Sequence, residues 1–157
     1  MFREMRRKDK EKSTDDITRI IKDGEYGVLS TIGENGYPYS TPLGYTYING
    51  SIYFHSAKVG EKLDNIAYNE NVCFCIIGGT NVLPEKFSTE YESVVIFGKA
   101  SIVEDENKKN VFISILNKYS KDFIKEGLVY IDRAISNTTV IKITIDKVTA
   151  KGTPKVK

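Results

Sequence analysis

The segment 53–66 concentrates groups that can bind a phosphate. It is typical of a strand that runs into the start of a helix. At the junction, Ser56 supplies a hydroxyl, and Lys58 and Lys62 supply ammonium groups. Gly60 permits a tight turn, and a helix that begins there points its free N–H groups and the positive end of its dipole at the same place. The sequence therefore predicts a site for a phosphorylated ligand.

The composition indicates one soluble globular domain over residues 1–157. The chain has 157 residues, of which 40% are hydrophobic and 28% are charged. A chain of this length buries roughly 70% of its unfolded surface, so it needs no disulfides for a core. No apolar run approaches the ~18 residues of a membrane span, and the charged start lacks the apolar part of a signal peptide. We expect a cytoplasmic protein with no membrane partner.

Charge is unevenly distributed although the net charge is only +2. Residues 1–12 form a basic arm with six basic and three acidic side chains. The arm is either solvated and partly disordered, or it folds over an anionic ligand. The polar tail, residues 151–157, is predicted to be loose. A basic-armed binder of single-stranded nucleic acid is disfavoured, because most of the aromatic residues alternate within predicted strands.

The two cysteines, Cys73 and Cys75, are two positions apart in an apolar run, so in a strand they share one face. His55 is the only histidine, which leaves no plausible zinc set. We predict buried, reduced thiols and no metal site.

Hydrophobic spacing and turn residues predict an antiparallel barrel with helices packed on its outside. Ser13 or Thr14 caps a first helix that ends at Gly24, a second helix begins near Gly60, and a third spans about 106–118. Residues 120–136 are either helical or looped. Six strands are predicted: 26–31, 38–47, 51–55, 72–78, 91–103 and 138–149.

The connections between these strands carry their own signals. Asn-Gly pairs at 35–36 and 49–50 predict two successive hairpins, hence a meander. Strand 72–78 is almost wholly apolar and is predicted to be buried on both faces. Residues 78–88 are predicted to form a loop, and Gly98 a bulge or bend in the strand that follows.

The nature of the ligand follows by elimination. The sequence has no Gly-x-Gly-x-x-Gly fingerprint, no Walker-type loop and no Gly-x-Ser-x-Gly elbow. A phosphate pocket on an antiparallel barrel, next to aromatic and small apolar strand residues, fits a flat, phosphorylated, redox-active ring system. We therefore expect flavin mononucleotide, FMN.

Several motifs follow one another along the chain, at 5–11, 26–31, 37–45, 53–57, 60–65 and 91–100. Taken in this order, they resemble one family, the Nim proteins of nitroimidazole resistance, which are relatives of pyridoxamine-phosphate oxidase with the FMN-binding split-barrel fold. The resemblance runs from about residue 5 to residue 149. It implies a mainly β (α+β) fold: a six-stranded antiparallel split β-barrel with peripheral helices.

The resemblance also implies a homodimer with FMN at the subunit interface. Lys62, Ser56 and the backbone of Ala57 would hold the phosphate, and His55 would act catalytically beside the ring. The residues that would line the isoalloxazine are Pro42, Leu43, Gly44 and Tyr45. The residues that would approach from the other subunit are Ser93 and Val94.

Each of these side chains also has a structural interpretation. A lone histidine on a strand, as His55 is, is often hydrogen-bonded structure, although an imidazole that titrates near pH 6.5 could supply protons to a substrate. Lys62 could be a solvated helix charge. Tyr45 and Tyr47 could be core or barrel-rim aromatics instead of flavin stackers. The guanidinium groups of residues 6–7 could reach the cofactor or substrate, or remain in solvent.

The function that these residues predict is an FMN-dependent oxidoreductase that reduces small, electron-poor, nitroimidazole-like compounds. The bound flavin carries the electron transfer, which explains why no conventional catalytic constellation is visible. The alternative is a non-catalytic flavin-binding or redox-sensing module. The sequence leaves open the electron donor, the physiological substrate, and the choice between FMN and a deazaflavin.

Overall fold

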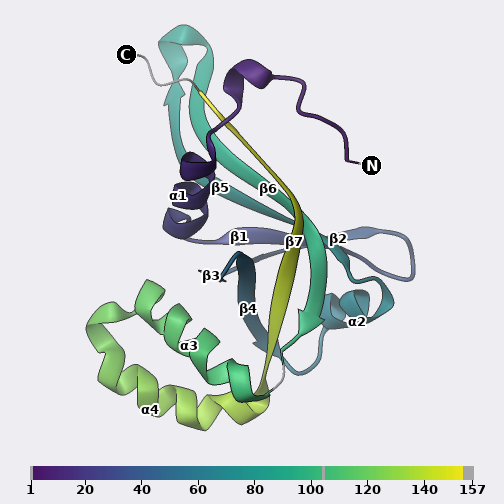
Figure 1. Cartoon of the computed structure of the whole chain (residues 1–157), viewed down its shortest axis with the longest axis vertical. Helices are drawn as coiled ribbons and strands as arrows, with labels where there is room; N and C mark the ends of the chain where they lie inside the picture. Colours follow the sequence, from purple (N-terminus) through teal and green to yellow (C-terminus); the bar gives the residue numbers. More distant parts are fainter. Residues whose placement is uncertain (1, 104, 154–157) are drawn as a thin grey trace.

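A computed structural model describes residues 2–103 and 105–153. In this part of the chain seven antiparallel strands form one strongly curled sheet in the order β2-β1-β5-β6-β7-β4-β3, with four α-helices around it (Figure 1). The strands are β1 (Gly27–Ile32), β2 (Pro38–Leu43), β3 (Thr46–Ile48), β4 (Ser51–Ala57), β5 (Asn71–Leu83), β6 (Ser88–Ile102) and β7 (Thr138–Gly152). The helices are α1 (Thr14–Asp23), α2 (Glu61–Tyr68), α3 (Asp105–Tyr119) and α4 (Ile124–Ala134), with short 3-10 turns at Lys8–Lys10 (η1), Pro84–Lys86 (η2), Lys121–Phe123 (η3) and Ile135–Asn137 (η4).

The predicted split barrel with peripheral helices is confirmed, but the strand number is seven and not six. The predicted strand 38–47 is interrupted at Gly44 and Tyr45, which divide it into β2 and β3. The backbone N–H of Tyr45 donates to the Tyr119 hydroxyl, 2.9 Å away. Because a helix side chain takes this N–H, the ladder is broken at that point.

Both predicted hairpins form, since β1 pairs with β2 and β3 pairs with β4. Asn49 and Gly50 adopt the positive φ angles (47° and 79°) that a tight hairpin turn needs. The two hairpins lie at opposite ends of the sheet order, however, so they do not continue into a single meander. β7 closes the sheet by pairing with both β6 and β4.

The predicted loop 78–88 is wrong, because β5 continues to Leu83 and β6 starts again at Ser88. After a register shift between Ile77 and Thr80, the two strands pair on to Leu83 opposite Ser88, with η2 as the turn. They form a long hairpin that projects at the top of Figure 1. Pairing with β6 outweighs the loop-like composition of this segment. Further along β6, the predicted irregularity at Gly98 is confirmed as a register shift against β7.

β5 is buried on one face only, contrary to the prediction. Phe74 and Ile76 are fully buried, whereas Ile77 is 56% exposed. Cys73 and Cys75 are half-buried free thiols, not fully buried ones. Partial burial raises the pKa of both thiols, which keeps them protonated near neutral pH.

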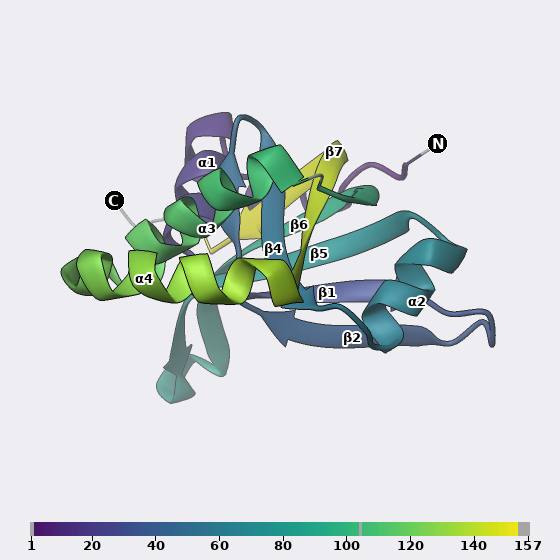
Figure 2. The ribbon, with the colours of Figure 1, turned by 90° about the horizontal axis from the view of Figure 1, so that it is seen from below.

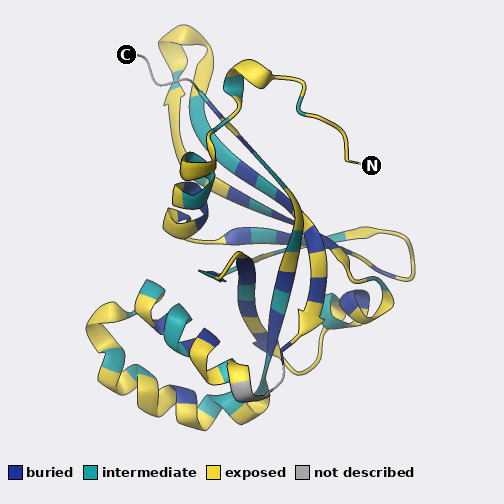
Figure 3. Cartoon of the chain, viewed as in Figure 1, coloured by how far each residue is buried: buried dark blue, intermediate teal, exposed yellow. Residues whose placement is uncertain are grey.

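The interior consists of two hydrophobic clusters that share β4 (Figure 3). Phe54 points into the larger cluster inside the barrel, and Tyr53 packs against the smaller cluster beneath α3 and α4. Figures 1 and 2 show α3 and α4 side by side at the end of the molecule away from the β5–β6 hairpin. The larger cluster includes Ile20, Leu29, Phe54, Phe74, Ile96, Ile141 and Ile143, and the smaller one Val103, Val111, Phe112, Leu116, Ile131 and Val140.

Helix ends follow the predicted signals. The Ser13 hydroxyl caps α1 by accepting from the N–H of Asp16 (3.2 Å), and Gly24 follows its last residue. Gly60 precedes α2 with φ 138°, a conformation that favours glycine. α3 extends one residue beyond the predicted 106–118 at each end, and most of 120–136 is helical.

The end of the arm and the start of the tail are joined by backbone contacts. The N–H of Lys12 donates to the carbonyl of Ala150 (3.1 Å), and the backbone of Glu11 forms an isolated antiparallel β-bridge with that of Lys151. β7 therefore runs to Gly152, so the tail is not loose there, and residues 154–157 lie outside the described residues. Within the described chain, no helix is both long and apolar enough to cross a membrane.

Candidate functional site

The structure brings together the two side chains predicted to hold a phosphate. Ser56, buried near the end of β4, lies with its Oγ 3.5 Å from Nζ of Lys62 in the first turn of α2. Lys62 has no acidic partner among the described residues, so its charge is available to a ligand. The backbone of Ala57 follows at the exposed end of the strand. A cation, a hydroxyl and a helix start at one point form an anion-binding arrangement.

His55 lies on the opposite face of β4 from Ser56, because successive side chains of a strand alternate. Its ring is 5.5 Å from the ring of Phe112 in α3, at an interplanar angle of 42°. Partial burial against this apolar neighbour lowers the pKa of His55. The imidazole is therefore largely neutral near pH 7, and it is separated from the Ser56–Lys62 pair by the strand itself.

The predicted ring-binding segment forms the crossover from β2 to β3. Pro42 and Gly44 are exposed, while the Leu43 side chain packs against the larger hydrophobic cluster. The Tyr45 side chain is fully buried: its hydroxyl donates to the carbonyl of Ile21 (2.6 Å). Burial raises the pKa of this phenol well above its usual value. Tyr45 is thus a core residue, and its ring is not free to stack on a flavin.

Two residues at the end of α3 hold this crossover, and the sequence analysis missed both. The Tyr119 hydroxyl accepts from the Tyr45 N–H and lies 2.6 Å from the carbonyl of Glu25 and 3.0 Å from that of Tyr45. The Lys118 ammonium lies 3.7 Å from the centre of the Tyr45 ring. Burial lowers the pKa of Lys118 to about 8, against a smaller opposing effect of Asp23. No local pattern in the sequence links α3 to the crossover.

Thr41 adds a further polar group that the sequence analysis did not select. Its Oγ1 is buried and has no hydrogen-bond partner among the described residues. It lies on β2 immediately before the exposed Pro42, so its only sequence signal is the position next to a predicted contact. An unpartnered buried hydroxyl costs about 1–3 kcal/mol, which a ligand could recover. Together with the unpaired Lys62, it makes the residues present a reasonable fit to a phosphorylated ring cofactor.

The other predicted contacts lie apart from this group. Ser93 and Val94 are on β6, which β7 separates from β4 in the sheet. Val94 is fully buried in the larger cluster, and Ser93 is half-buried on the opposite face. They pair with Lys151 and Ala150 near the end of β7, whereas Ser56 pairs with Thr139 near its start, so within this chain they lie apart from the Ser56–Lys62 pair.

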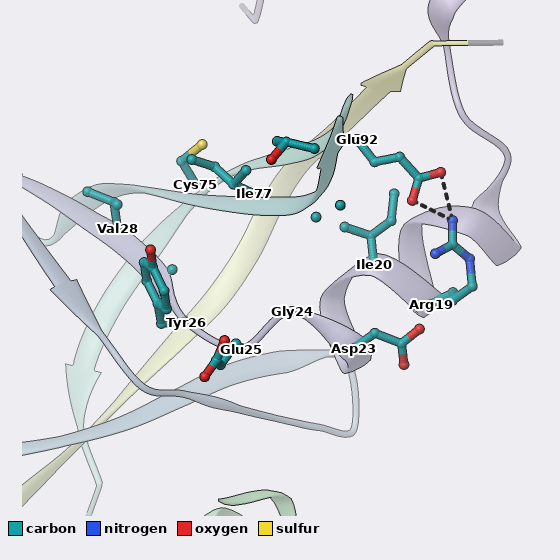
Figure 4. A pocket seen from close by; sticks show the side chains of 14 residues that line it. Arg19, Ile20, Asp23, Gly24, Glu25, Tyr26, Val28, Cys75, Ile77 and Glu92 are labelled. Carbon is teal, nitrogen blue, oxygen red and sulfur yellow. Dashed lines mark hydrogen bonds and ion pairs between the residues drawn. The ribbon is translucent and has the colours of Figure 1, made fainter. Parts of the chain in front are cut away.

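A different hollow, of about 410 Å³, lies beside α1 (Figure 4). Its charged side chains are partly compensated, because Arg19 makes a double hydrogen bond to Glu92 (2.9 and 2.8 Å). None of the predicted site residues lines it. Residues 6–7 of the arm do not line it either; they are exposed, and Arg7 pairs with Asp9. In the described chain, no three His, Cys, Asp or Glu residues are placed to hold a metal ion.

Comparison with solved structures finds the same fold in several proteins. A protein from Bacteroides thetaiotaomicron, provisionally described as a 5-nitroimidazole antibiotic resistance protein, matches with 28% identity and TM-score 0.77, over 90% of this chain and 84% of that one. A conserved hypothetical protein from Mycobacterium tuberculosis matches with 22% identity and TM-score 0.83 (98% and 96%). An FAD-binding protein from Mesorhizobium loti matches with 20% identity and TM-score 0.64 (91% and 96%).

No curated protein matches the chain. Residues 13–152 do match a protein family described as pyridoxamine 5'-phosphate oxidase. This match covers all seven strands and the four helices, including the Ser56–Lys62 pair and the crossover at Tyr45. The chain therefore belongs to the pyridoxamine 5'-phosphate oxidase family.

Proposed function

We propose that this protein binds FMN and uses it to reduce small, electron-poor aromatic compounds. The observation that carries the proposal is the Lys62 ammonium at the start of α2, which lies beside the buried Ser56 hydroxyl and has no acidic partner among the described residues. Membership of the oxidase family and the likeness to an FAD-binding protein support a flavin. The likeness to a protein described in terms of nitroimidazole resistance supports an electron-poor substrate.

The chain would hold the cofactor at two points. Lys62 and Ser56 would bind the phosphate, with about 1.5–3 kcal/mol for each charge-assisted hydrogen bond. The Thr41 hydroxyl and the exposed backbone at Pro42 and Gly44 would meet the polar edge of the ring. A bound flavin supplies the electrons.

His55 would act as a proton donor in the reaction. Reduction of a nitro group consumes protons as well as electrons, and His55 is the only histidine of the chain. Burial lowers the pKa of His55, so the imidazole is mostly neutral near pH 7; its less populated protonated form would be a stronger acid than a free imidazolium and would donate its proton more readily.

Two copies would complete the site. The β5–β6 hairpin exposes large apolar side chains: Phe87 is 98% exposed, Val82 67% and Ile77 56%. Exposed apolar side chains on a projecting hairpin support the proposal that another protein chain covers this surface. The contacts expected from Ser93 and from the backbone of Val94 would then come from this second copy, since the Val94 side chain is enclosed in the core. Light scattering of the purified protein measures its molar mass in solution and thus tests whether two copies associate.

A non-catalytic flavin-binding or redox-sensing module is the alternative. It is favoured by the scarcity of acid–base groups, because among the predicted contacts only His55 titrates near neutral pH. The two functions differ in turnover. Rapid reduction by a nicotinamide donor, followed by oxidation by a nitroaromatic compound, supports the enzyme; a flavin that binds but does not exchange electrons supports the module.

The test of flavin binding is a Lys62→Ala variant titrated with FMN by flavin fluorescence. Loss of a charge-assisted phosphate contact should raise the dissociation constant about tenfold or more. Lys22→Ala is the matched control, because Lys22 is an exposed lysine in the last turn of α1. Equal FMN affinity in both variants would exclude the Ser56–Lys62 pair as the phosphate site.

A further inference from the structure

The helix α2 connects two strands that lie near opposite ends of the sheet. In the strand order, β1 is second from one end and β4 is second from the other, and the two do not pair with each other. Lys62 Nζ lies 3.5 Å from Ser56 Oγ of β4, and Asn65 Nδ2 donates to Thr31 Oγ1 of β1 (3.0 Å). Figures 1 and 2 show α2 beside the β1–β2 hairpin. The position of Lys62 relative to β1 and β2 therefore depends on how this helix is held.

The contact between α2 and β1 is buried and continues into β2. Asn65 is 6% exposed and Thr31 is 1% exposed. The Thr31 hydroxyl donates to the carbonyl of Tyr39 in β2, 3.4 Å away. Because a hydroxyl has only one proton to donate, Thr31 must accept from the Asn65 amide, which fixes the orientation of that amide. Two hydrogen bonds in series thus run from α2 through β1 to β2.

The β1–β2 turn packs against the same amide. A Cβ added at Gly33 would lie 2.7 Å from Asn65 Oδ1, so a side chain at this position would displace the amide. Among the described residues, Asn65 is the one side chain of α2 that hydrogen-bonds to β1 or β2. The polar anchor of α2 on this part of the sheet is therefore a single amide, held by Thr31 on one side and by the turn on the other.

This anchor lies between the two proposed contacts of the cofactor. Asn65 is three residues after Lys62, so both lie on neighbouring positions of one helix face. Thr41, whose hydroxyl is proposed to meet the ring, lies two residues after Tyr39 and thus on the same face of β2. Asn65 is too buried to contact a ligand itself. It can act on the cofactor only by setting where Lys62 stands relative to β2.

We propose that Asn65 and Thr31 are positioning residues, which hold Lys62 at the distance from β2 that a phosphorylated flavin requires. They would thereby make the site prefer FMN over riboflavin, which has the same ring system without the phosphate. Functional side chains keep their full effect only when supporting contacts hold them within about 0.5 Å of the required position. The inference rests on the proposed function, because it concerns the phosphate contact of that same site.

The test compares the dissociation constants of FMN and riboflavin, each measured by the change in flavin fluorescence on binding. Thr31→Val keeps the shape of the side chain and removes the hydroxyl, and Asn65→Ala removes the amide. Each should weaken FMN binding about three- to tenfold and leave riboflavin binding unchanged. A variant that only folds less completely weakens both flavins by the same factor, so the ratio of the two constants isolates the positioning effect.

Further variants control for the substitutions. Thr31→Ser retains the hydroxyl and should keep the wild-type preference for FMN. Asn117→Ala removes an exposed amide from α3 and should keep it too. Gly33→Ala displaces the Asn65 amide without replacing it and should lower the preference as Asn65→Ala does. In a Lys62→Ala background, Asn65→Ala should cause no further decrease, because its effect passes through Lys62.

The outcomes separate this inference from the phosphate site itself. If Lys62→Ala lowers the preference for FMN and neither Thr31→Val nor Asn65→Ala does, the inference is wrong and the phosphate site stands. If Asn65→Ala lowers the preference by the same factor with and without Lys62, the amide acts by another route and the positioning role is refuted. If Lys62→Ala leaves the preference unchanged, the phosphate site is wrong and this inference fails with it.

Discussion

Replacement of Tyr119 by phenylalanine tests how α3 holds the β2–β3 crossover. The Tyr119 hydroxyl receives the Tyr45 N–H at 2.9 Å and lies 2.6 Å from the carbonyl of Glu25. Tyr45 is fully buried, so its N–H cannot turn to water in the variant. Glu25 is exposed, and its carbonyl can bind water instead. The main cost is therefore one orphaned buried amide, about 1–3 kcal/mol.

The expected loss of unfolding free energy in Tyr119→Phe is large enough to measure by thermal and urea denaturation. For a chain of this size a loss of about 2 kcal/mol lowers Tm by roughly 4–8 °C. Urea denaturation followed by far-UV circular dichroism should show a lower midpoint at an unchanged slope, since the surface exposed on unfolding stays the same.

A matched variant controls for the loss of any phenol. Tyr37→Phe removes a hydroxyl from a side chain that is 75% exposed, and its stability should stay within about 0.5 kcal/mol of wild type. If Tyr119→Phe is as stable as Tyr37→Phe, the hydroxyl does not hold the crossover. The interruption between β2 and β3 would then need another cause.

Two further outcomes concern pH and packing. Because burial lowers the pKa of His55 below its ordinary 6.5, the unfolded chain binds this proton more readily than the folded protein. Wild type should therefore lose stability relative to His55→Gln as pH falls through and below this value. If urea denaturation gives the same difference in unfolding free energy between the two proteins at high and low pH, the partial burial of the ring is contradicted. Gly98→Ala would place a Cβ 2.2 Å from the carbonyl oxygen of Thr144 and should lower the free energy of unfolding by about 1–3 kcal/mol or more. Gly79→Ala is the control, because its added Cβ would have no atom within 4 Å, and it should melt like wild type. Similar melting temperatures for both variants would refute the close approach of β6 and β7.

The features that were predictable from sequence are those that neighbouring residues determine. Ser56 and Lys62 are six positions apart, at a strand–helix junction, and the structure joins them. The turn at Asn49 and Gly50 and the cap at Ser13 follow from the same kind of local chemistry. In such cases one or two turns of chain fix the geometry, so the sequence contains the answer.

The errors arose where pairing or packing over a long distance decided the conformation. The segment 78–88 has the glycine, asparagine and proline of a loop, yet backbone pairing with β6 holds it as a strand. The helix α4 could not be assigned because its buried residue, Ile131, packs within the cluster beneath α3 and not against a neighbour in sequence. The bond between Tyr119 and Tyr45 spans 74 residues and has no local signature.

Tyr119 links α3 to the segment proposed to meet the flavin. Its hydroxyl accepts from the backbone N–H of Tyr45, next to the exposed Gly44, and a Cβ at Gly44 would lie 3.4 Å from the Tyr119 ring, an ordinary van der Waals contact. A displacement of this side chain would therefore remove a support of the crossover as well as a neighbour of Gly44. Because coupling between two binding events is reciprocal, the flavin and a group that displaces Tyr119 would change each other's affinity.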